Sequence, residues 1–188
     1  MIKEAIFKIL LFISAFVPMY VLLLLKFIIE IITNKLSTDF VNIFMVTFLS
    51  VLTILGTCAV LILFKNTCTK KQKIKLTQVN NTTDQHFLSY FSLFVLFALT
   101  FELEKISMAV VFIVILLFIG IVYIKNNLYH INPFLNILGY SFYNITCEIN
   151  GKTQNLKVFY NGKLRENFTY LVCDMLSNFT VVKNINKK

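Results

Sequence analysis

The stretch ISMAVVFIVILLFIGIVYI, residues 106–124, decides the class of this protein, because its 19 residues contain no Asp, Glu, Lys or Arg. A spanning helix needs roughly 17–25 apolar residues, and this stretch lies inside that window. The whole chain is 57% hydrophobic and 14% charged, whereas a soluble domain carries about 25% charged residues. Three further runs lack these four residue types: Ile9–Leu25, Phe40–Phe64 and Gln85–Phe101. The sequence therefore predicts a membrane all-α part, residues 1–124, with four transmembrane helices.

The placement of lysine predicts the orientation. The middle loop, residues 65–84, holds five lysines, and the tail from Lys125 holds seven lysines and one arginine. The other two loops contribute only Lys35 and Lys105. Positive charge marks the cytoplasmic side of short loops, so both termini, the middle loop and the tail are expected in the cytoplasm. The excess of Lys over Arg, with abundant Asn, Ile and Phe, is typical of AT-rich coding and favours a bacterial origin.

The tail, residues 125–188, changes character and is expected to be a small cytoplasmic α+β domain. Asn132 is a predicted N-cap, Pro133 the first helical position and Gly139 the helix stop. Residues 140–149 alternate between apolar and polar, which predicts a strand, and Asn150-Gly151 is typical of a hairpin turn. Residues 168–179 fit a helix by spacing, although the run Thr-Tyr-Leu-Val would also suit a strand.

The segment 129–143 is predicted to be a rigid joint that orients the tail against the membrane and presents a partner surface. Its short helix, residues 133–138, is strongly apolar. It is either an interfacial anchor or simply the core of the tail. The joint residues are Asn132, Pro133, Phe134, Gly139, Tyr140 and Tyr143.

Two features of the membrane part carry hydroxyl groups or charge. Thr47, Ser50, Thr53 and Thr57 fall on one helical face beside Gly56, and such stripes usually pack helices together; the alternative is the lining of a narrow oligomeric pore.

Lys26 and Glu30 lie one turn apart, which predicts an interfacial charge pair near a helix end. The alternative for the pair is a buried ion pair in a transport path. Pro18 is expected to bend the first helix.

The sequence offers no sign of catalysis or cofactor binding. It has no phosphate-binding or dinucleotide motif, no nucleophile motif and no clustered carboxylates, so an enzyme is not expected. The cysteines at 58, 68, 147 and 173 lack ligand spacing, and reduced thiols are expected in the cytoplasm. No metal and no cofactor are predicted.

The opening of the tail resembles a known family. The run INPFLNILGYSFY, the predicted four spans and the lysine-rich middle loop are similar to the KwaA family, the membrane subunit of the Kiwa anti-phage defence system. The matching residues are Ile131, Asn132, Pro133, Leu135, Asn136, Gly139, Tyr140, Phe142 and Tyr143. The resemblance implies a bacterial inner-membrane protein that senses infection and acts with a cytoplasmic partner, KwaB, which binds DNA.

Two functions therefore compete. The first is a non-enzymatic membrane sensor or scaffold, a homo-oligomer in the lipid bilayer that works through a cytoplasmic KwaB-like protein and reaches nucleic acid only through that partner. The alternative is a small oligomeric pore or channel, holin-like or an abortive-infection effector. The face on which the hydroxyl stripe lies would separate them.

Overall fold

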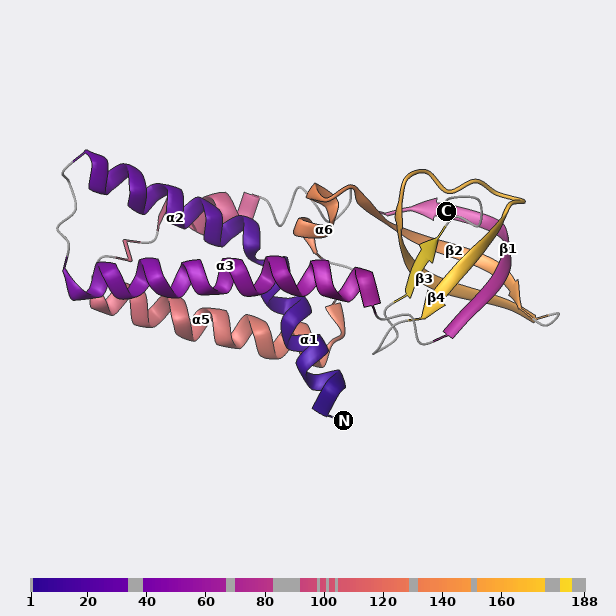
Figure 1. Ribbon diagram of the computed structural model, residues 1–188, viewed down its shortest axis with the longest axis horizontal. Helices are drawn as coiled ribbons and strands as arrows, with labels where there is room; N and C mark the ends of the chain where they lie inside the picture. The colour runs from indigo at the N-terminus through magenta and orange to yellow at the C-terminus, as the bar shows by residue number, and fades with distance from the viewer. Residues whose placement is uncertain are drawn as a thin grey trace.

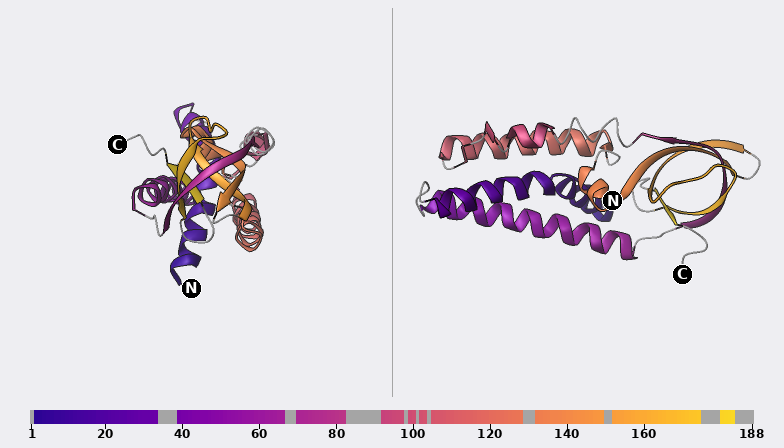
Figure 2. Two further views of the ribbon diagram at one scale, coloured as in Figure 1. Left: turned by 90° about the vertical axis from the view of Figure 1, so that its right-hand side faces the viewer. Right: turned by 90° about the horizontal axis from the view of Figure 1, so that it is seen from above.

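The computed structural model describes residues 2–33, 39–66, 70–82, 92–97, 99–100, 102–103, 105–128, 132–149, 152–174 and 180–183. Apolar helices occupy one end of its long axis and a β-barrel occupies the other, with a short helix between them (Figure 1). A second view from above shows the same separation (Figure 2). The order of elements is α1 (Ile2–Ala15), α2 (Val17–Ile32), α3 (Phe40–Asn66), β1 (Lys70–Asn81), α5 (Ile106–Lys125), α6 (Pro133–Ile137), β2 (Tyr140–Ile149), β3 (Lys152–Asn161), β4 (Thr169–Asp174) and β5 (Thr180–Lys183).

The helices depart from the prediction of four transmembrane spans. Among the described residues, two helices are long and apolar enough to cross a membrane, namely Phe40–Leu61 of α3 and Ile106–Lys125 of α5. A third candidate exists if α1 and α2 count as one broken span, because they are bent by 47° at a break. Pro18 stands in the first turn of α2, so the predicted bend is confirmed. The predicted run Gln85–Phe101 lies partly outside the described residues, which show helix at 92–97 and 99–100.

Helix α3 crosses very close to the break between α1 and α2. A Cβ atom on Gly56 would lie 2.5 Å from Val17 Cγ2 and 3.2 Å from the carbonyl oxygen of Ile13. Only a residue without a side chain allows this approach, since a Cβ contact under 3 Å forces a neighbour to move. The glycine therefore lets α3 lie directly in the notch between α1 and α2.

The barrel is closed by five strands in the order β1-β2-β3-β5-β4. All neighbouring pairs are antiparallel except β3 and β5, which are parallel. Strand β1 pairs with β4 along its first half and with β2 along its second half, and a register shift separates Leu76 from Gln78. Such irregularities bend a strand, which lets β1 serve both sides of the closed barrel.

The predicted α+β tail is also corrected. Strand β1 comes from the lysine-rich middle loop, so the barrel draws on both sides of the boundary predicted at residue 124. Residues 169–174 form strand β4 rather than a helix. The prediction for β2 is confirmed at Tyr140–Ile149, whereas the predicted turn at Asn150-Gly151 lies outside the described residues.

Buried apolar residues form two clusters, which define the helix core and the barrel core. The barrel core lies inside the strands and includes Ile74, Leu76, Ile145 and Val158. The helix core collects residues from α1, α2, α3 and α5. It also takes in Leu135 of α6 and three residues of the barrel strands, and this shared part is where the candidate site lies.

Candidate functional site: the joint between helices and barrel

Asn132 connects the joint to the first helix. It is buried, and its Nδ2 donates to Ser14 Oγ at 2.9 Å and to the carbonyl oxygen of Leu11 at 3.4 Å, both in α1. Its Oδ1 accepts from the backbone N–H of Leu135 at 3.2 Å, which confirms the N-cap prediction for α6. Ser14 Oγ in turn donates to the Leu11 carbonyl oxygen at 2.7 Å. One amide thus caps α6 and fastens it to α1, and an unmade bond here would be costly because the group is buried.

Leu135 carries the apolar side of the joint. It is 0% exposed and belongs to the helix core. On the barrel, one row runs across the outside of three strands: Phe142 pairs with Phe159, and Phe159 pairs with Val181. These three residues are only 4%, 3% and 2% exposed and join the same cluster. This boundary row, Phe142, Phe159 and Val181, makes the barrel wall part of the helix core.

The remaining predicted joint residues take separate roles. Pro133 is buried at the first position of α6, whereas Phe134 is only partly buried against the helix core. Gly139 has φ +84°, a conformation that other residues adopt at a cost, and it turns the chain from α6 into β2. Tyr140 is half-buried, and this burial raises the pKa of its hydroxyl.

Tyr143 lies on the other side of β2 from the joint. Its ring belongs to the barrel core, and its hydroxyl donates to the carbonyl oxygen of Gly162 at 2.9 Å. The structure therefore brings together Asn132, Pro133 and Gly139 around α6, with Tyr143 inside the barrel. Sequence reasoning missed Ser14 and the boundary row, although the alternation in β2 already placed Phe142 opposite Tyr143.

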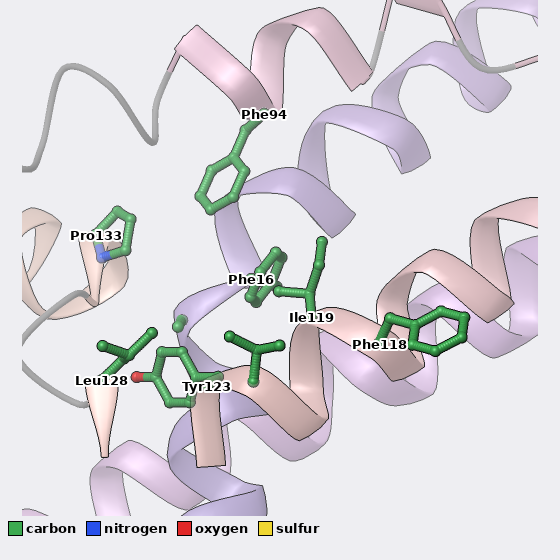
Figure 3. A pocket seen from close by; sticks show the side chains of 9 residues that line it. Phe16, Phe94, Phe118, Ile119, Tyr123, Leu128 and Pro133 are labelled. Carbon is green, nitrogen blue, oxygen red and sulfur yellow. The ribbon is translucent and has the colours of Figure 1, made fainter. Parts of the chain in front are cut away.

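A cavity of about 320 Å³ lies beside the joint. It is lined by Ala15 and Phe16 at the helix break, Phe94, Leu128 and Pro133, and by Phe118, Ile119, Val122 and Tyr123 of α5. Figure 3 shows the rings of Phe16, Phe94 and Tyr123 around it, with Pro133 on the side of α6. Ring contacts link Tyr123, Phe12, Phe16 and Phe94 at centroid distances of 5.0–5.5 Å. A single apolar hollow thus touches the helix break, α5 and the joint.

The hydroxyl stripe of α3 lies at the edge of its buried face. Thr47 is exposed, while Ser50, Thr53 and Thr57 are half-buried. Each hydroxyl donates to the carbonyl oxygen four residues earlier, at 2.7–2.8 Å. The stripe therefore satisfies its polar groups within its own helix. Its packing against a neighbouring helix, rather than the lining of a pore, stays a prediction.

The predicted charge pair lies at the end of the helices away from the barrel. Lys26 and Glu30 line a small polar hollow of about 160 Å³ together with Glu102. Lys105 pairs with Glu102, and the hydrogen bond from Lys105, with a smaller contribution from the charge of Lys26, lowers the pKa of the Glu102 carboxyl. Lys26 thus acts on Glu102 as well as standing one turn from Glu30, and the pairing of Lys26 with Glu30 stays a prediction.

The cysteines bring one correction. Cys58 and Cys147 are free, but Cys173 is disulfide-bonded, so the expectation of reduced thiols is wrong for that residue. Within the described ranges, no group of three or more His, Cys, Asp or Glu side chains could hold a metal ion.

These features define a class of protein: apolar helices, two or three of them long enough to cross a membrane, that hold a five-stranded barrel through a capped and buried joint. The family described as "Anti-phage protein KwaA" matches residues 7–182, nearly the whole chain. The chain therefore belongs to the KwaA anti-phage protein family, and the resemblance drawn from the joint motif is confirmed. Neither the curated proteins nor the solved structures gave a match.

Proposed function

We propose that this anti-phage protein is a non-enzymatic sensor or scaffold of the bacterial inner membrane that passes a change in its helices to the barrel through the joint. One observation carries the proposal. The helix core includes both Leu135 of α6 and the boundary row on the outer wall of the barrel. Because packed cores have discrete arrangements rather than deforming smoothly, a shift at the helix break would move the barrel as a unit.

The proposed output is a cytoplasmic KwaB-like protein that binds the barrel. Strand β1 supports this role because Lys71, Lys73 and Lys75 are all exposed on the outside of the barrel, while Ile74 and Leu76 face inward. A row of ammonium groups favours an acidic partner surface. Nucleic acid would be reached through that partner.

The proposed orientation places both termini and the barrel in the cytoplasm. The positive-inside bias of the lysines supports it. So does the bond from Lys8 Nζ to Asn127 Oδ1, 3.2 Å, which places α1 beside the end of α5 that leads to the barrel. The disulfide at Cys173 instead favours a barrel outside the cytoplasm, since such bonds persist mainly in oxidising compartments. Reporter fusions at Lys71 and at the C-terminus decide the matter: cytoplasmic signals at both support the orientation, and an extracytoplasmic signal at either rejects it.

The experiment for the relay compares partner binding with insertion. Gly139→Val forces a branched side chain into the positive-φ turn, and Phe134→Asp places a charge against the helix core. Both variants should reach the membrane at parental abundance, yet lose co-purification of the KwaB-like partner and protection against phage. Normal binding and protection in both variants would show that the segment is a tolerant linker.

The pore alternative has its own measurement. Purified protein in liposomes should release no trapped ions under the sensor proposal. Ion flux that disappears when Thr47, Ser50, Thr53 and Thr57 are replaced by Ala would favour a pore instead.

A further inference from the structure

The cavity beside the joint has a mostly apolar lining. Its nine lining residues are aliphatic or aromatic, with Tyr123 the only one that carries a side-chain polar atom. Apolar cavities of this kind stay dry and accept hydrocarbon. At about 320 Å³, the space lies at the lower end of the range for small-molecule sites.

The rim of the cavity lies on the outer surface of α5. Phe118 and Val122 line it and are 66% and 50% exposed, respectively. The same surface of α5 exposes Val111, Val114 and Ile121. In a spanning helix these side chains face lipid, so the hollow opens toward acyl chains rather than toward water.

Two lysines lie at the end of α5 that also supplies lining residues of the cavity. Lys125 follows Phe118 by seven residues and Val122 by three, which places all three on one face of α5. Lys8 Nζ donates to Asn127 Oδ1, next to the lining residue Leu128. An acyl chain in the hollow would therefore leave its headgroup beside positive charge at the end of the spanning helix, the position where anionic lipids are attracted.

We propose that the cavity binds one acyl chain of an anionic phospholipid, whose phosphate lies against Lys125 and Lys8. Because Ala15, Phe16 and Pro133 share the lining, the chain contacts the helix break and the first residue of α6 at once. Lipid occupancy is thus a direct way for the bilayer to set the position of the joint. This site deepens the proposed sensing role and rests on the membrane placement of α5, but its test needs no phage.

The test uses the absence of tryptophan from the sequence. The Phe94→Trp variant, full-length and purified in detergent, reports only from the cavity wall, because Phe94 is 1% exposed. The probe is phosphatidylglycerol with brominated acyl chains, which quenches a tryptophan on contact. The expected result is saturable quenching at low lipid-to-protein ratio. Leu128→Trp, on another side of the cavity, provides a second reporter and should show the same half-saturation.

Matched variants on α5 separate the cavity from the general lipid surface. Val122→Phe narrows the mouth and should raise the half-saturating lipid about tenfold, the effect of losing roughly two buried methylene contacts. Ile121→Phe, at the adjacent exposed position, should leave it unchanged. Brominated phosphatidylcholine should bind more weakly than brominated phosphatidylglycerol, by about fivefold for each lysine that contacts the anionic phosphatidylglycerol headgroup. Lys125→Gln should reduce the difference in affinity between the two lipids. Lys105→Gln, at the other end of α5, should leave this difference unchanged.

Three results would overturn the proposal. Quenching that never saturates in either reporter would mean that bulk lipid alone is sensed. Equal half-saturation in Val122→Phe and Ile121→Phe would remove the cavity as the site. Equal affinity for the two lipids would reject the anionic headgroup. The proposed function fails separately, through loss of the link between joint variants and phage protection.

Discussion

The two apolar cores of this molecule are built differently, and β2 supplies both. Tyr143, Ile145 and Cys147 point into the barrel core, which the strands close around themselves. Phe142, which precedes Tyr143 and lies on the opposite face of the strand, joins the helix core with Phe159 and Val181. A closed core stabilises one unit, whereas a shared core fixes two units relative to one another. Substitutions in the barrel core and in the shared core should therefore have different consequences.

The largest loss of stability is expected from a substitution inside the barrel. Ile145→Asp would place a carboxylate in a position that is 1% exposed, at a cost of several kcal/mol, roughly 4 or more, comparable with the whole stability of a small domain. The barrel should become sensitive to protease in membrane vesicles. Asn144→Asp, at the neighbouring exposed position, is the control and should resist digestion as the parent does. A protease-resistant barrel in Ile145→Asp would mean that this face of β2 is not a closed core.

A smaller loss of stability, with a different structural consequence, is expected from a substitution in the boundary row. Phe159→Ala removes a buried ring and should cost about 3 kcal/mol, borne by the contact between barrel and helices. The barrel itself should still resist protease, but its fixed position on the helices should be lost. Disulfide cross-linking between cysteines introduced at Ser14 and Asn132 should fall relative to the parent pair. Phe168→Ala, at an exposed position, should leave the cross-linking yield unchanged.

The crossing of α3 at the helix break should be sensitive to a single methyl group. Gly56→Ala brings a Cβ to 2.5 Å from Val17 Cγ2, and overpacking of this kind costs about 1–3 kcal/mol. Thermal unfolding of the purified protein should occur at lower temperature. The double variant Gly56→Ala with Val17→Ala should recover part of the loss, because the clashing methyl group is gone. An additive loss in the double variant would contradict the close crossing.

The smallest loss of stability is expected from substitutions at the hydrogen bond between Asn132 and Ser14 in the joint. Ser14→Ala and Asn132→Ala should each cost about 1–2 kcal/mol, since each leaves a buried partner unsatisfied. A double-mutant cycle in denaturant should give a positive coupling energy. A coupling energy of zero would show that the bond between Asn132 Nδ2 and Ser14 Oγ does not hold α6 on α1.

Local signals in the sequence predicted some elements well, and the reason is physical. Helix α5 follows from its own composition, and α6 with β2 follows from the N-cap at Asn132, the turn at Gly139 and the alternation after it. Each of these signals lies within a few residues of the element that it specifies. The role of Asn132 as a cap was therefore predictable, whereas its bond to Ser14 joins residues 118 positions apart and was not.

Strand β1 shows why the fold class was missed. Its residues Lys73, Ile74, Lys75 and Leu76 alternate as a strand should, but the lysines also fit a cytoplasmic loop, and its pairing partners lie far along the chain in β2 and β4. Similarly, Pro18 signalled the bend but not that α1 and α2 would be separate helices. In the five-residue helix α6, spacing alone did not distinguish the half-buried Phe134 from the fully buried Leu135.

The coupling of the helices to the barrel is tested most directly by phage plating on cells that carry Leu135→Ser or Ile137→Ser, each co-expressed with the proposed KwaB-like partner. Both residues lie on α6, but Leu135 is buried in the shared core and Ile137 is exposed. Membrane abundance and protease resistance of the barrel are measured in the same cells. We expect Leu135→Ser to lose protection at parental abundance, with the barrel folded, and Ile137→Ser to protect fully. Full protection by Leu135→Ser under those conditions would contradict the claim that the joint couples the helices to the barrel.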